Sequence, residues 1–160
     1  MRIKDVMSHP VVSCRLDSKL DAVARLMAEF NCGAVPIVDA EGKLAGMLTD
    51  RDICLAALNK GQALDLIPVS AVMAKQVFSC HAEDLVESAE RLMRDQHIRR
   101  VPVTDASGRP VGILAVDDLA RMAARAKKSG VDREFVQMLA EVCRPAAVTA
   151  EPAARAGARA

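Results

Sequence analysis

The chain has 160 residues, of which 51% are hydrophobic and 27% charged, so its composition is that of a globular protein of one ordinary domain or two very small ones. It carries 22 basic and 21 acidic residues, and it contains three Phe but no Trp or Tyr. This balanced charge and the shortage of stacking side chains argue against a nucleic-acid-binding surface, so we expect no nucleic-acid partner.

The sequence contains an internal repeat. Residues 5–58 align with residues 71–124 without a gap, and 17 of these 54 positions are identical. The identical positions include glycines, a proline and aspartates, which indicates a duplicated structural unit rather than a shared composition. One such unit is too small to bury its own apolar face, so we expect the two units to pack as a pseudo-twofold pair.

Both units predict the same order of elements: strand, helix, strand, strand, helix. In the first unit we expect a strand at 11–13, a helix opened at Ser18 and ended by Gly33, strands at 34–38 and 44–48, and a helix from near Asp50 to Gly61. In the second unit we expect strands at 77–79, 100–104 and 111–115, and helices at 84–96 and 117–129. The expected fold class is α/β (α+β), with two β-α-β-β-α repeats packed through their sheets.

A further amphipathic helix is expected beyond the second unit. After Gly130, Asp132 offers a cap, and one apolar stripe follows at i, i+3, i+4 and i+7, formed by Phe135, Met138, Leu139 and Val142. The stripe has three open roles: packing on its own module, joining a dimer, or docking on a partner. The resulting division of the chain is a first repeat at 1–62, a linker at 63–70, a second repeat at 71–129, the helix at 130–144 and a flexible tail at 145–160.

Both units contain the pattern V-P-[IV]-x-D-A-x-G-x-x-x-G-[MI]-L-x-x-x-D, at residues 35–52 and 101–118, and each copy is preceded by a Val-Met pair, at 6–7 and 72–73. This pattern resembles the CBS-domain family, and the tandem pair over about residues 1 to 126 resembles one Bateman module of a stand-alone bacterial-type protein. The resemblance implies a regulatory sensor that binds AMP, ADP, ATP or S-adenosylmethionine between the repeats and signals through a partner or a dimer rearrangement. A structural or interaction dimer without a nucleotide ligand stays open as the alternative.

The first of two expected sites combines a hydroxyl and a carboxylate at the start of a helix. Thr49 and Asp52 have this spacing, which offers acceptors to a ribose diol and a helix N-terminus to a phosphate. The resemblance implies a site shared between the repeats, with Arg99 and Arg100 facing the phosphate. Its residues are Met47, Thr49, Asp52, Phe78, Ile98, Arg99 and Arg100. The alternatives are that Asp52 only caps its helix and that the two arginines are surface charges.

The second expected site is weaker. It has Asp118 beside Val12 and Cys32, but Ala115 stands at the hydroxyl position. The positions that match the two arginines are Gly33 and Ala34, so we expect weak, nucleoside-preferring or no binding, or a carboxylate that only caps its helix.

Several other classes of function lack support in the sequence. We find no nucleophile elbow, phosphate-binding glycine loop or zinc-protease motif, and we expect neither catalysis nor a cofactor other than the nucleotide. His9 and His81 have no ligand partner at suitable spacing, so no metal site is expected. Five cysteines without a C-x-x-C motif favour reduced thiols in the cytoplasm, and we expect neither a membrane span nor an export signal. The nearly all-apolar helical stretches 53–58 and 119–124 need cover on more than one side, and the resemblance implies that such modules join as dimers through their helices, so we expect a homodimer.

Overall fold

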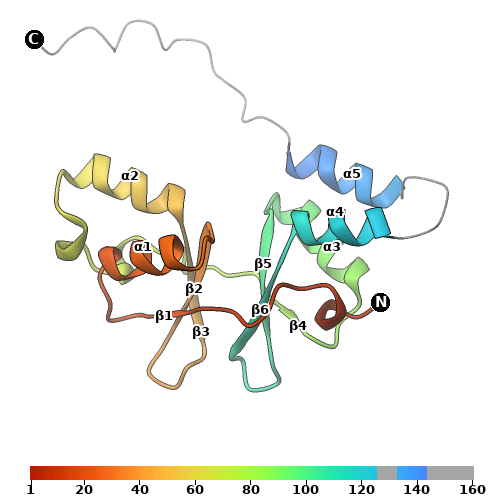
Figure 1. Cartoon of the computed structure of the whole chain (residues 1–160), viewed down its shortest axis with the longest axis horizontal. Helices are drawn as coiled ribbons and strands as arrows, with labels where there is room; N and C mark the ends of the chain where they lie inside the picture. The colour runs from red at the N-terminus through yellow and green to blue at the C-terminus, as the bar shows by residue number, and fades with distance from the viewer. Residues whose placement is uncertain (126–132, 144–160) are drawn as a thin grey trace, which may run out of the picture.

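The computed structural model describes residues 1–125 and 133–143 and shows two similar α+β units side by side (Figure 1). The first unit contains β1 (Cys14–Arg15), α1 (Leu20–Glu29), β2 (Ala34–Val38), β3 (Leu44–Thr49) and α2 (Asp50–Lys60). The second contains β4 (Cys80–His81), α3 (Val86–Gln96), β5 (Arg100–Thr104), β6 (Pro110–Ala115) and α4 (Val116–Arg125). Short 3-10 turns lie at Ile3–Asp5, Leu64–Leu66 and Val69–Ala71, and α5 spans Arg133–Val142. The expected fold class and the duplication are confirmed.

Each unit has a three-stranded sheet, in the orders β1-β2-β3 and β4-β5-β6. The first strand of each sheet runs parallel to the second, and the second is antiparallel to the third. The turns between the antiparallel strands contain Gly42 and Gly108, whose φ values of 80° and 81° suit glycine. β2 is buried along its whole length, which explains why its residues are apolar at every position rather than at alternate ones.

The segment before each unit's first strand crosses to the other unit. Ser8 forms an antiparallel bridge with Ile113 of β6, and Ala74 forms the equivalent bridge with Met47 of β3. Ile3 accordingly lies in the core of the second unit, and Val6 and Met7 pack against that core. This exchange ties the two units together by backbone hydrogen bonds as well as by side-chain packing.

The crossing segments explain a glycine in the third strand of each unit. A Cβ on Gly46 would lie 3.1 Å from the carbonyl oxygen of Ala74 and would collide with the Met73 sulfur. A Cβ on Gly112 would lie 3.0 Å from the carbonyl oxygen of Ser8. Both glycines are therefore needed because another backbone segment passes directly over the strand.

The apolar stripe of α5 packs on its own module. Phe135, Met138 and Val142 are buried in the core of the second unit, and Leu139 packs against that core. The helix lies against α3, and the first unit has no equivalent cover in the part of the chain that the structure describes (Figure 1).

Some details differ from the expectations. The first strands pair at Cys14–Arg15 and Cys80–His81, slightly later in the chain than expected. Ser18 does not cap α1, because that helix begins at Leu20, whose amide donates to the carbonyl of Ile67 at 3.0 Å. The end of the helix expected at 117–129, the Asp132 cap and the tail at 145–160 lie outside the described residues. Within residues 1–125 and 133–143, no helix has the length and apolar character needed to cross a membrane.

Candidate functional site

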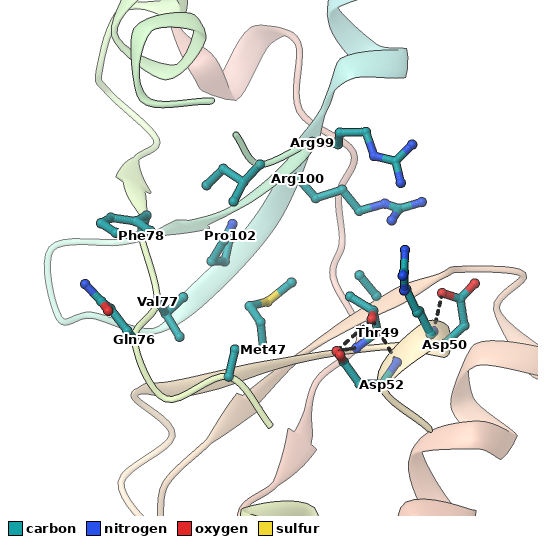
Figure 2. A pocket seen from close by; sticks show the side chains of 14 residues that line it. Met47, Thr49, Asp50, Asp52, Gln76, Val77, Phe78, Arg99, Arg100 and Pro102 are labelled. Carbon is teal, nitrogen blue, oxygen red and sulfur yellow. Dashed lines mark hydrogen bonds between the residues drawn. The ribbon is translucent and has the colours of Figure 1, made fainter. Parts of the chain in front are cut away.

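A cavity of about 320 Å³ opens between the two units, beside the junction of β3 and α2 (Figure 2). The structure brings together in it every residue predicted for the first site: Met47, Thr49, Asp52, Phe78, Ile98, Arg99 and Arg100. Both units contribute to its walls, as the shared site expected from the resemblance requires. That these residues bind a ligand stays a prediction.

Thr49 and Asp52 form a reciprocal cap at the start of α2. Asp52 Oδ2 accepts from the Thr49 amide at 2.9 Å and from Thr49 Oγ1 at 2.7 Å, and the Asp52 amide donates to Thr49 Oγ1 at 3.3 Å. All bonds to this carboxylate fall on Oδ2, and Oδ1 accepts none from the residues that the structure describes. Capping and ligand binding are therefore compatible roles, because each uses a different oxygen of one half-buried carboxylate.

Arginine side chains gather at one end of the cavity. Arg99 and Arg100 extend from the start of β5 over the first turn of α2 (Figure 2). Arg51, which the sequence analysis missed, adds a third guanidinium to the lining. None of the three pairs with an acid anywhere in the described ranges. With Asp50 and Asp52 as the only acids in the lining, the charged end carries a net positive charge and suits an anion.

The opposite end of the cavity is largely apolar. Phe78, Val77, Pro102 and Met47 lie there around a slot, with the amide of Gln76 at its edge (Figure 2). Such a slot suits a flat, weakly polar ring with a few hydrogen-bonding atoms. Gln76 and Pro102 were missed by the sequence analysis, although each lies close in the chain to a residue that it did predict, Phe78 and Arg100 respectively.

At the second site, Asp118 has partners on both oxygens. Its Oδ2 accepts from the Ala115 amide at 2.8 Å, and its Oδ1 accepts from Ser8 Oγ at 2.9 Å and from the Arg121 guanidinium. Only 4% of Asp118 is exposed. Through the internal repeat, Val12 and Cys32 hold the places of Phe78 and Ile98, and both are half-buried. The two predicted sites therefore differ in their carboxylates: Asp52 has one oxygen without a donor from the described residues, whereas both oxygens of Asp118 are hydrogen-bonded.

Comparison with known proteins places this geometry in a family. The sequence profile of the CBS domain matches residues 3–59 and 69–125, so the chain belongs to the CBS domain family as a tandem pair. It is 39% identical over 118 residues to the CBS domain-containing protein YhcV of Bacillus subtilis, a match that covers 74% of this chain and 82% of that protein. It is 29% identical over 145 residues to hypoxic response protein 1 of Mycobacterium tuberculosis, covering 91% of this chain and 96% of that protein.

Solved structures agree with the fold. The CBS domain pair of protein MJ0100, in complex with 5'-methylthioadenosine and S-adenosyl-L-methionine, superposes with a TM-score of 0.71 at 28% identity, covering 79% of this chain and 98% of that one. Hypoxic Response Protein I with two coordinated zinc ions superposes with a TM-score of 0.68 at 30% identity, covering 76% and 98%. Among the residues described for this chain, no three His, Cys, Asp or Glu side chains gather in a way that would hold a metal ion.

Proposed function

We propose that this CBS pair is a non-catalytic sensor that binds a phosphorylated adenosine ligand in the cleft beside Asp52. One observation carries the proposal: within the described part of the chain, one cavity is lined both by Asp52, whose Oδ1 has no protein donor, and by three arginines without an acid partner. The adenosyl ligands named for the MJ0100 pair support an adenosyl class of ligand. Binding would be passed on through a protein partner or through a rearranged dimer.

The cavity suggests how such a ligand would lie. The ribose hydroxyls would donate to Asp52 Oδ1, the adenine would enter the slot beside Phe78, and the phosphates would face Arg99 and Arg100. This order follows the gradient from apolar to positively charged lining along the cavity (Figure 2). The same charge disfavours the sulfonium cation of S-adenosylmethionine, so we propose AMP, ADP or ATP rather than that ligand.

The test compares adenosine, AMP, ADP, ATP and S-adenosylmethionine by thermal shift and calorimetry. A ligand at 100 times its Kd stabilises the fold by about 2.7 kcal/mol, which raises Tm by several degrees. The double variant Arg99→Ala/Arg100→Ala should bind the three nucleotides at least about tenfold more weakly and adenosine nearly unchanged. A matched double variant, Arg91→Ala/Arg109→Ala, removes two exposed arginines that do not line the cavity and should bind like the parent.

Two outcomes would count against the proposal. An equal loss for adenosine and the nucleotides would assign the arginines to the scaffold rather than to a phosphate. If none of the five compounds shifted Tm, the structural or interaction dimer without a nucleotide would be the better interpretation.

A further inference from the structure

The two equivalent aspartates make the same bond with one oxygen and different bonds with the other. In both units Oδ2 accepts from the backbone amide three residues earlier, which is that of Thr49 for Asp52, at 2.9 Å, and that of Ala115 for Asp118, at 2.8 Å. Asp52 lines the cavity and its Oδ1 has no donor within the described part of the chain, whereas Asp118 Oδ1 accepts from both Ser8 and Arg121. The oxygen left free for a ribose at one site is thus doubly occupied at the other.

The amino-acid sequence accounts for this difference in hydrogen bonding. Ser8 comes from the crossing N-terminal segment, and its counterpart in the second repeat is Ala74. Arg121 lies on α4 at i+3 from Asp118, and its counterpart is Leu55 on α2. Neither an alanine nor a leucine side chain can donate a hydrogen bond, so the first unit lacks both donors.

The bonds at Asp118 oppose ligand entry in two ways. A ribose would have to displace a charge-assisted bond to Arg121 as well as the bond to Ser8. Separating Arg121 from a carboxylate that is only 4% exposed would leave a buried charge without its cation. The arginine positions of the first site correspond here to Gly33 and Ala34, so no guanidinium from those positions compensates through a phosphate.

We propose that Arg121 and Ser8 close the second cleft by occupying its ribose-binding carboxylate, so that each chain binds one adenosine ligand. This inference rests on the proposed function for the Asp52 cleft. The first unit then supplies the ribose-binding carboxylate of the one open cleft, and the second unit supplies Phe78 and the two arginines to the same cleft.

A reciprocal exchange of residues tests the proposal, with adenosine as the probe because it needs no phosphate donors. Ala74→Ser/Leu55→Arg gives the first site the donors of the second and should weaken adenosine binding at least about tenfold. Ser8→Ala/Ala115→Thr/Arg121→Leu gives the second site the residues of the first at the three positions around the carboxylate and should raise the calorimetric stoichiometry from one to two per chain. Leu55→Met removes the same leucine without adding a donor or a cation and should bind like the parent.

Two results would overturn the proposal: parent-like adenosine affinity in Ala74→Ser/Leu55→Arg, or a stoichiometry that stays at one in the opened triple variant. Melting temperatures of ligand-free variants test the role of Arg121 at Asp118 separately from the proposed nucleotide binding. Asp118→Asn and Arg121→Leu should each lower Tm, and the double variant should lower it by less than the sum of the two shifts. Additive shifts would show that the pair does not hold the carboxylate, whether or not any nucleotide binds.

Discussion

At the scale of single residues, the two carboxylate oxygens of Asp52 differ in their hydrogen bonding. Oδ2 completes the cap of α2 with Thr49, and Oδ1 has no donor from the described residues, while Asp52 as a residue lines the cavity. Asp118 has the same cap bond but is buried, with Ser8 and Arg121 on its other oxygen. Equivalent substitutions should therefore have different effects in the two units.

We expect Asp52→Asn to weaken AMP or ATP binding by about tenfold or more, because hydrogen bonds to a charged carboxylate contribute roughly 1.5–3 kcal/mol each. Asp118→Asn should leave the affinity within about twofold and lower Tm instead, because it removes the buried charge that Arg121 pairs with. Calorimetry and thermal melts on both variants measure this contrast. A larger loss of affinity for Asp118→Asn than for Asp52→Asn would reverse our ranking of the sites.

Cys80 predicts a pH dependence of stability that is unrelated to the cleft. Burial raises the pKa of its thiol from 9.0 to about 11, and the charge of Asp84 adds to the rise. The folded thiol stays protonated while the unfolded one ionises, so the contribution of Cys80 is full below pH 9 and is lost as the pH rises toward 11. By pH 10 the parent should have lost about 1 kcal/mol more of its unfolding free energy than Cys80→Ala has.

Urea unfolding at pH 8 and pH 10 measures this difference. Cys54→Ser, at an exposed cysteine, serves as the control and should follow the parent. The same pH slope in the parent and in Cys80→Ala would show that this thiol is not the cause.

At the scale of elements, the duplication made most of the secondary structure predictable. β2 and β5 lie within the predicted ranges because their apolar runs are bounded by turns that recur at equivalent positions of the two repeats. β1 and β4 begin later than predicted, and the chain six residues before each of them, at Ser8 and Ala74, pairs with the other unit instead. That crossing depends on contacts between residues far apart in the sequence, such as Ser8 with Ile113, so local pattern does not reveal it.

The site was predictable to a similar degree. The spacing of Thr49 and Asp52 at a helix start, together with the resemblance, was enough to predict Asp52, Arg99 and Arg100 as site residues. The i, i+3 spacing of Asp118 and Arg121 on a helix is a local pattern that favours their ion pair, whereas the bond from Ser8 joins residues far apart in the sequence and has no such local pattern.

The packing of α5 predicts unequal effects for two of its residues. Met138 is 1% exposed and lies in the core of the second unit, whereas Val136 is 44% exposed. Met138→Ala should cost about 2–5 kcal/mol of unfolding free energy, and Val136→Ala should change it by less than about 0.5 kcal/mol. Denaturant unfolding measures both. Equal effects of the two substitutions would mean that α5 does not depend on its stripe for docking.

At the scale of the whole molecule, the helical face of the first unit is less well covered than that of the second. Phe30, Leu55 and Leu58 are exposed on α2 and at the end of α1, while α5 packs against α3 in the second unit. Exposed apolar side chains on adjacent helices favour association, so we expect a homodimer joined through the helices.

Leu58, which is 77% exposed, provides the test of this assembly. Light scattering at micromolar concentration should give the mass of two chains for the parent and a shift toward one chain for Leu58→Lys. Leu85→Lys, at an exposed leucine of the second unit, should stay dimeric. A monomeric parent under these conditions would refute the dimer.

The most direct test of the account is a crystal structure of the full chain with ADP. We expect the ribose hydroxyls at Asp52 Oδ1, the adenine beside Phe78 and the phosphates at Arg99 and Arg100, with Asp118 still bonded to Arg121. A nucleotide bound at Asp118, or phosphates directed away from the arginines, would contradict it.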